Sequence, residues 1–156
     1  MDPTTYRDAV VENRRTHGFE VVDEHTGGFD PLWKARAEDA TLGQVVVLAT
    51  LQTRQSVSPS ELTELADAFR AVVAEQVDRT RSSTTPIGYL VVGVPDPDPN
   101  VVEAATSYTV AERRTNVFPI VYDCDAEQLH CHDVPRLKGR GIYQRQATDA
   151  ERLFAV

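Results

Sequence analysis

The fold of this chain is decided by the stretch QVVVLATLQT at residues 44–53. Its four consecutive apolar residues at 45–48 are three β-branched valines and a leucine, and they follow a polar, turn-forming segment. A short apolar run of this kind predicts a strand that is buried on both faces. The run IGYLVVGV at residues 87–94 has the same character. We therefore expect a central sheet that is covered on both sides.

Helix and turn signals surround these two strands. The clearest lies at residues 58–61, SPSE, which supplies an N-cap, a proline at the first helical position and a capping-box glutamate. Thr4 or Thr5 can cap a first helix, and Gly18 is placed to end it in the left-handed conformation. The predicted elements in chain order are helix 5–17, strands 19–23, 31–38 and 44–53, helix 58–77, strand 87–94, helix 99–114, strand 116–122 and a returning strand 129–133.

This order predicts an α/β fold class with a mixed central sheet flanked by helices on both faces. Early strands joined by turns must run antiparallel, whereas later strands joined by helices can run parallel. The 156 residues fit one domain, with a core over about residues 5–122 and a C-terminal hairpin and basic loop over about 116–156. No G-x-G-x-x-G motif follows a strand, which argues against a doubly wound dinucleotide-binding fold.

Composition restricts the partners and the compartment. The net charge of -8 excludes a globally basic surface that coats nucleic acid, and fourteen arginines stand beside only two lysines. This balance resembles that of proteins from extreme halophiles, haloarchaea among them, although a high-GC bacterium would also favour arginine. Molar salt would remove most of the counterion-release affinity for phosphate.

Residues 1–20 contain no apolar signal-peptide core, and no apolar run approaches the roughly 20 residues of a membrane span. We expect a cytoplasmic protein without a membrane partner.

Three segments carry a resemblance to a known superfamily. They are GFEVV at residues 18–22, GGFD at residues 27–30, and the helix-to-strand run over residues 61–94. With the predicted order of elements, the chain resembles the restriction-endonuclease-like, or PD-(D/E)xK, superfamily, and within it Mrr-type endonucleases and archaeal Holliday-junction resolvases. The resemblance covers about residues 5–122 and implies an α-β-β-β-α-β core. It also implies phosphodiester hydrolysis with Mg²⁺ held by carboxylates, and an E-x-K or Q-x-K motif whose lysine orients the attacking water.

The catalytic pattern carries over only in part. Asp30 matches the first metal ligand, and Glu12 matches an extra acid that some members have on the first helix. Leu48 and Thr50 fall at the expected second-ligand and lysine positions, where neither can do that work. Gln52, followed by Thr53 and Arg54, mimics Q-x-K further along the same face, but arginine cannot serve as a base. The resemblance therefore implies a degenerate nuclease centre. Asp30 by itself also suits an ordinary turn before a proline.

Two further segments contain residues that could bind a ligand, one a metal ion and the other a nucleic acid. Cys124, His130, Cys131 and His132 form the densest group of soft metal ligands, but their spacing is not that of a zinc site, so a surface hairpin with a partly buried cysteine is the preferred interpretation. Residues 134–146 reverse the overall charge. Candidate nucleic-acid contacts in this loop are Arg136, Lys138, Arg140, Tyr143 and Arg145. The alternative is that these cations pair with an acidic surface. The pairs Arg14-Arg15 and Arg113-Arg114 are expected in the last turns of helices.

Three hypotheses follow for function. The first is a non-catalytic, nuclease-like domain that binds nucleic acid or a protein partner without a cofactor, with Arg136, Lys138 and Arg140 beside Asp30. The second is a Mg²⁺-dependent nuclease with a rearranged site that uses Asp30, Gln52 and Glu12. The third is a structural or assembly protein, such as a homodimer, with the apolar face around Leu48 and Thr50 as its interface.

Overall fold

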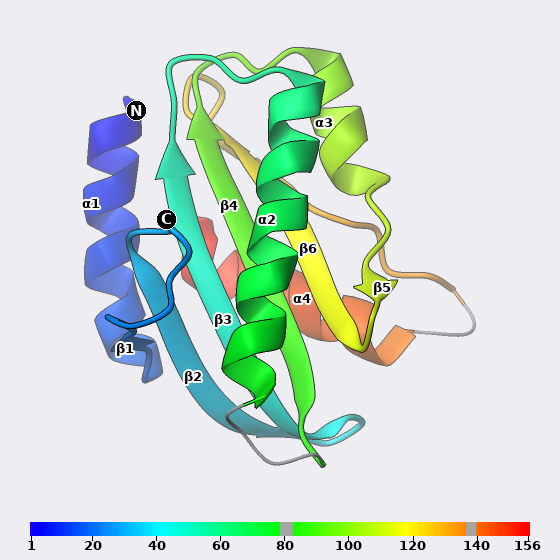
Figure 1. Cartoon of the computed structure of the whole chain (residues 1–156). Helices are drawn as coiled ribbons and strands as arrows, with labels where there is room; N and C mark the ends of the chain where they lie inside the picture. The colour runs from blue at the N-terminus through cyan, green and yellow to red at the C-terminus, as the bar shows by residue number, and fades with distance from the viewer. Residues whose placement is uncertain (79–82, 137–139) are drawn as a thin grey trace.

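A mixed sheet of seven strands forms the centre of the computed structural model, which describes residues 1–78, 83–136 and 140–156 (Figure 1). Within these residues the strands are β1 (Glu20–Val21), β2 (Leu32–Asp39), β3 (Gly43–Thr53), β4 (Thr85–Val94), β5 (Ala111–Glu112), β6 (Thr115–Asp123) and β7 (Gln128–His130). The order across the sheet is β1-β2-β3-β4-β6-β5, and β7 also pairs with β6. Strands β3, β4 and β6 are parallel, and the other pairs are antiparallel. The prediction of a mixed central sheet is confirmed.

Helices cover both faces of this sheet, as expected. Figure 1 shows α2 (Pro59–Asp78) and α3 (Pro99–Thr106) in front of the sheet, with α4 (Arg140–Phe154) behind it. The first helix, α1 (Pro3–Arg14), shares the face of α4, because Tyr6 and Val10 belong to the same buried cluster as Leu153. The two crossovers from β3 to β4 and from β4 to β6 therefore both pass over the α2 side.

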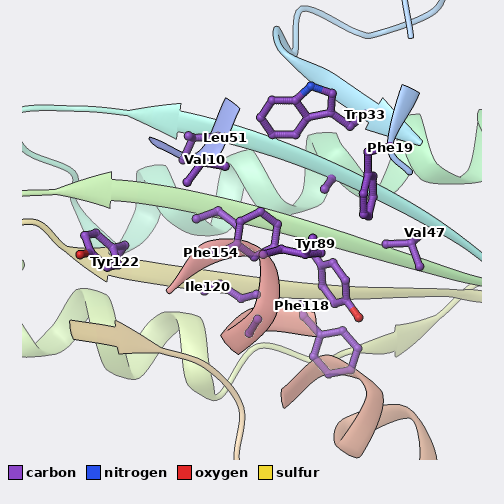
Figure 2. Close-up of a cluster of buried hydrophobic side chains, with 14 of the residues drawn as sticks. Val10, Phe19, Trp33, Val47, Leu51, Tyr89, Phe118, Ile120, Tyr122 and Phe154 are labelled. Carbon is purple, nitrogen blue, oxygen red and sulfur yellow. The ribbon is translucent and has the colours of Figure 1, made fainter. Parts of the chain in front are cut away.

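The core consists of two apolar layers, one on each side of the sheet. Figure 2 shows the layer beneath α1 and α4, where Phe154 of α4 meets the central strands and Trp33 is almost fully buried. In this layer the rings of Tyr6 and Tyr122 stack with centroids 3.8 Å apart. The opposite layer contains Phe69 of α2 and Leu48 of β3. Burying each large apolar side chain contributes roughly 1.5–3 kcal/mol, so the two layers supply the main stabilisation.

Local signals predicted several boundaries well. The Ser58 amide donates to Glu61 Oε1 at 3.0 Å, and the Glu61 amide donates to Ser58 Oγ at 3.1 Å, which is the predicted capping box. Gly18 has φ of 75° and follows a short 3-10 turn at Arg15–His17. The first helix begins earlier than predicted, because Asp2 caps it in place of Thr4 or Thr5 and accepts from the Thr5 amide.

The predicted helix over 99–114 is wrong beyond Thr106. At its end the Thr106 and Ser107 hydroxyls donate to the carbonyls four residues earlier, an arrangement that competes with regular helix. The next segment is held on α2, because Arg70 Nη2 donates to the Thr109 carbonyl at 2.6 Å. Arg113 and Arg114 have φ of 51° and 64° and form the turn between β5 and β6. They are not helix-terminal cations.

The predicted C-terminal basic loop is also wrong from Arg140 onward, because α4 occupies this region. The helical signal was present. Gln146, Ala150, Leu153 and Phe154 recur at intervals of three and four residues and are all buried. The basic residues at the start of the segment obscured this period, and Gly141 weakened it further.

Candidate functional site

Asp30 lies on the surface at the start of β2, on the α2 side of the sheet. Its neighbour Phe29 is buried edge-on against Phe69 of α2, with ring centroids 5.2 Å apart. Its other neighbour, Pro31, is joined to it by a cis peptide bond, and the Pro31 carbonyl accepts from Thr50 Oγ1 at 2.8 Å. Within the described part of the chain, the exposed Asp30 carboxylate has no hydrogen bond or ion pair. It is therefore free to meet a ligand.

The strand register shows which end of β3 lies near Asp30. Leu32 pairs with Thr50 in the antiparallel ladder of β2 and β3. Asp30 precedes Leu32 by two residues, in a bend before β2, so it lies near the end of β3 at which Gln52 and Arg54 follow Thr50. Side chains alternate along a strand, so Gln52 shares the α2-facing side with Thr50. We call Asp30, Gln52 and Arg54 the β3-end cluster.

A chain of hydrogen bonds links two members of this cluster to the sheet. Gln52 Nε2 donates to Thr50 Oγ1 at 3.2 Å, which leaves the Gln52 carbonyl oxygen facing Arg54. The Arg54 guanidinium donates to that oxygen at 3.5 Å and to the Thr53 carbonyl at 3.2 Å. Bonds near 3.5 Å are weak, so the guanidinium is held only loosely. The Arg54 backbone, in contrast, is fixed by a hydrogen bond that its N–H donates to the Gly93 carbonyl at 3.0 Å.

Leu48 and Thr50 do not belong to a surface site. Both are fully buried beneath α2, and the Thr50 hydroxyl donates a hydrogen bond to the Pro31 carbonyl. The suggestion that they form the interface of a homodimer is wrong, because this face is already covered by a helix of the same chain. Glu12 is likewise not brought to Asp30. It is exposed on α1, in the layer on the opposite face, and it accepts from Arg15 at 3.4 Å.

The β3-end cluster has limited chemistry as it stands. Mg²⁺ prefers six oxygen ligands and usually one or two carboxylates, but only Asp30 offers one here. No group of three or more His, Cys, Asp or Glu side chains that could hold a metal occurs among the described residues. Arg54 remains charged at any ordinary pH and presents paired donors to a phosphate or carboxylate. The cluster is therefore suited to binding an anion.

Among the described residues, no three of Cys124, His130, Cys131 and His132 are arranged to hold a metal ion. Cys124 is buried, and burial raises the pKa of its thiol to about 11. His132 is buried against Phe118, and its Nε2 lies 3.0 Å from the Tyr108 carbonyl. This contact places the proton on Nε2, and Nδ1 has no partner within the described structure. Burial lowers the pKa of His132 from 6.5. The predicted surface hairpin forms, because β7 pairs antiparallel with β6, and Cys131 is partly buried just beyond β7.

The candidate nucleic-acid residues of the basic segment do not form one surface. Tyr143 packs edge-on against Phe118, with ring centroids 5.4 Å apart, and Arg145 forms ion pairs within the protein. Arg136 is exposed. Lys138 and the side chain of Arg140 lie outside the described residues.

The start of α4 is also far from Asp30. A methyl group added at Gly141 would lie 2.9 Å from Thr41, so α4 begins against the turn between β2 and β3. Asp30 stands at the other end of β2, roughly 25 Å away, and on the opposite face of the sheet. The expected juxtaposition of Arg136, Lys138 and Arg140 with Asp30 therefore finds no support in the described residues.

One buried polar cluster was not predicted. Asp149 of α4, only 1 % exposed, accepts from Tyr89 at 2.7 Å, from Arg145 Nε at 2.8 Å and from Arg152 at 3.0 Å. Arg145 also reaches Asp39 at 3.4 Å. An open hollow of about 300 Å³ lies beside these residues. The spacing of Arg145, Asp149 and Arg152 at i, i+4 and i+7 would have indicated the cluster if α4 had been recognised. Its charges balance, and it fastens α4 to the sheet.

Comparisons with models of protein families, with curated proteins and with solved structures gave no match. In the described part of the chain, none of the helices combines the length and apolar character needed to cross a membrane.

Proposed function

We propose that this chain is a restriction-endonuclease-like domain that binds the phosphate backbone of nucleic acid through the β3-end cluster without cleaving it. The order of elements supports the first part of the proposal. A helix, three antiparallel strands, a second helix and a strand parallel to the third follow one another from α1 to β4. This is the α-β-β-β-α-β order that the superfamily resemblance implies.

The observation that carries the proposal is the register of β2 and β3. The pairing of Leu32 with Thr50 puts the start of β2 beside the end of β3, and this supports a site that combines Asp30 with Gln52 and Arg54. The motif at this end of β3, over Gln52 to Arg54, is Q-x-R. Arginine in place of lysine keeps a positive charge for a phosphate oxygen but cannot give up a proton at neutral pH. Glutamine offers one neutral oxygen where a nuclease of the E-x-K type has a carboxylate, which leaves a metal with a single anionic ligand.

The geometry of Arg54 suits a binding role. Its bonds to Gln52 at 3.5 Å are long enough to be exchanged for stronger bonds to a phosphate. The fixed backbone of Arg54 would keep the guanidinium near the end of the sheet during that exchange. The negative charge of Asp30 repels a phosphate, so in the absence of a metal its carboxylate weakens phosphate binding.

A binding titration tests this function. Fluorescence anisotropy with linear, branched and single-stranded DNA, over a series of salt concentrations, should show binding that weakens with salt. Arg54→Ala should weaken binding to all sequences alike and should lower the magnitude of the salt slope by about one. Arg113→Ala, which removes an exposed arginine from the turn between β5 and β6, is the matched control. Absence of binding at every salt concentration would contradict a nucleic-acid role.

A second pair of measurements separates binding from catalysis. Asp30→Asn should strengthen DNA binding, because it removes a negative charge beside the phosphate. If Asp30 held a metal that bridges to DNA, the same change would weaken binding in the presence of Mg²⁺. The unaltered protein, incubated with the same DNA and Mg²⁺ or Mn²⁺, should leave it intact. Metal-dependent cutting that Asp30→Ala abolishes would establish the nuclease instead.

A further inference from the structure

The second half of β2 is an open edge of the sheet. On its outer side β1 pairs only with Trp33 and Lys34, and the next residues of β2 have no neighbouring strand among the described residues (Figure 1). A hollow of about 320 Å³ lies along this edge, next to Lys34 and Arg36. An edge of this kind is a template for a further strand, because its outward backbone groups lack partners within the sheet.

The direction of the backbone groups follows from the pairing of β1 with β2. The Val22 amide donates to the Leu32 carbonyl at 2.8 Å, so the peptide groups of Leu32 point away from β3. Backbone direction alternates along a strand, so Arg36 and Glu38 also present their N–H and C=O groups outward. Neither residue makes a side-chain bond within the described structure, and both are exposed.

We propose that this edge pairs antiparallel with the same edge of a second copy of the chain, about a two-fold axis at Ala37. In this register Arg36 of each copy stands opposite Glu38 of the other. Directly opposite residues in an antiparallel pair have side chains about 5 Å apart, so each dimer gains two Arg–Glu contacts. Each pair also exchanges two backbone hydrogen bonds.

Charge selects this register over its neighbour. A two-fold axis at Arg36 would also match the outward backbone groups, but it would set Arg36 against its own copy. Like charges directly opposite destabilise a strand pair. Exposed charges usually protect an edge strand from pairing. Here the charges of Arg36 and Glu38 are opposite and symmetric about Ala37, so they favour pairing with the same edge of a second copy of the chain. The inference stands on the β2 edge alone and is independent of the proposed nucleic-acid role.

Charge-swap variants test the dimer by analytical ultracentrifugation. The unaltered protein should show a monomer–dimer equilibrium. Arg36→Glu places two acids on the edge and Glu38→Arg places two arginines there, so each variant alone should dissociate about tenfold or more readily. An equimolar mixture of the two variants should form heterodimers, because every opposite pair is again Arg–Glu. Circular dichroism checks that each variant folds, and the mixture shows that both retain a competent edge.

Two controls make the outcome decisive. Arg113→Glu makes the same charge change on an exposed turn and should leave the equilibrium unaltered. The double variant Arg36→Glu/Glu38→Arg restores complementarity within one chain and should dimerise like the unaltered protein. A monomer over the whole soluble concentration range would overturn the proposal. A dimer that survives both single changes would overturn it as well, since the interface would then lie elsewhere.

Discussion

The Tyr89 hydroxyl donates to Asp149 Oδ2 at 2.7 Å in the interior of the protein. The two residues are sixty positions apart and belong to the central strand β4 and to α4. Because Arg145 and Arg152 also donate to Asp149, its buried carboxylate is balanced and joins the last helix to the middle of the sheet.

Loss of the Asp149 carboxylate should therefore be costly. Asp149→Ala leaves Arg145 without its nearest anion and should lower the free energy of unfolding by about 3–5 kcal/mol. Arg152→Ala removes a partner whose side chain is 46 % exposed, and it should cost about 0–1 kcal/mol. Urea denaturation of both variants measures the difference. Equal losses would show that Asp149 is not the centre of the cluster.

Alkaline pH should destabilise the protein through its buried tyrosines. Burial raises the pKa of Tyr6 and Tyr89 well above 10.0, and the Asp149 carboxylate adds to the shift at Tyr89. The unfolded chain releases these protons first, so stability is fully present below pH 10 and falls as pH rises above it. Absorbance at the phenolate band should show that these two rings ionise only with unfolding. Tyr89→Phe should reduce the slope of stability against pH in this range.

Acidic pH should destabilise the protein through His132. Burial lowers its pKa from 6.5, so the unfolded chain takes up a proton before the folded one does. Stability from this source is present above pH 6.5 and is lost as pH falls below it. His132→Gln should remove that part of the pH dependence. An NMR titration in which the His132 ring protonates at the value of a free imidazole would contradict the expectation.

Arg70 should hold the segment that follows α3. Its guanidinium donates to the Thr109, Glu112 and Thr115 carbonyls and is only 6 % exposed. Arg70→Lys keeps the charge but cannot span these acceptors, and we expect a loss of about 2–3 kcal/mol. Hydrogen exchange should show faster exchange in β5 and the start of β6 than in β3. Uniform exchange rates would indicate that the segment is held by other contacts.

Much of the fold was predictable because it depends on local chemistry. The apolar runs at β3 and β4, the capping box at Ser58 and Glu61 and the left-handed Gly18 each need only neighbouring residues to act. The prediction failed where distant residues decide the outcome. After α3 ends at Thr106, Arg70 of α2 donates to the Thr109 carbonyl and holds this segment away from a helical path.

The candidate site shows the same division. Asp30, Gln52 and Arg54 were all identified as candidates from the sequence, but their position relative to one another in the fold was not predicted. Burial beneath α2 excludes Leu48 and Thr50, and the pairing of Leu32 with Thr50 brings the start of β2 to the end of β3, where Gln52 and Arg54 lie. The Tyr89–Asp149 contact was not predicted at all, since the helix that carries Asp149 had not been recognised.

By itself, the sequence determined the class of fold, the layered sheet and most element boundaries, because hydrophobic periodicity and capping act over a few residues. The tertiary structure alone decided the register of β2 against β3, the free edge at Arg36 and Glu38, and the burial of Asp149. These features depend on which strands and helices meet. That choice is made by packing of the whole chain, since a shift in register would carry every side chain of a strand to a different partner.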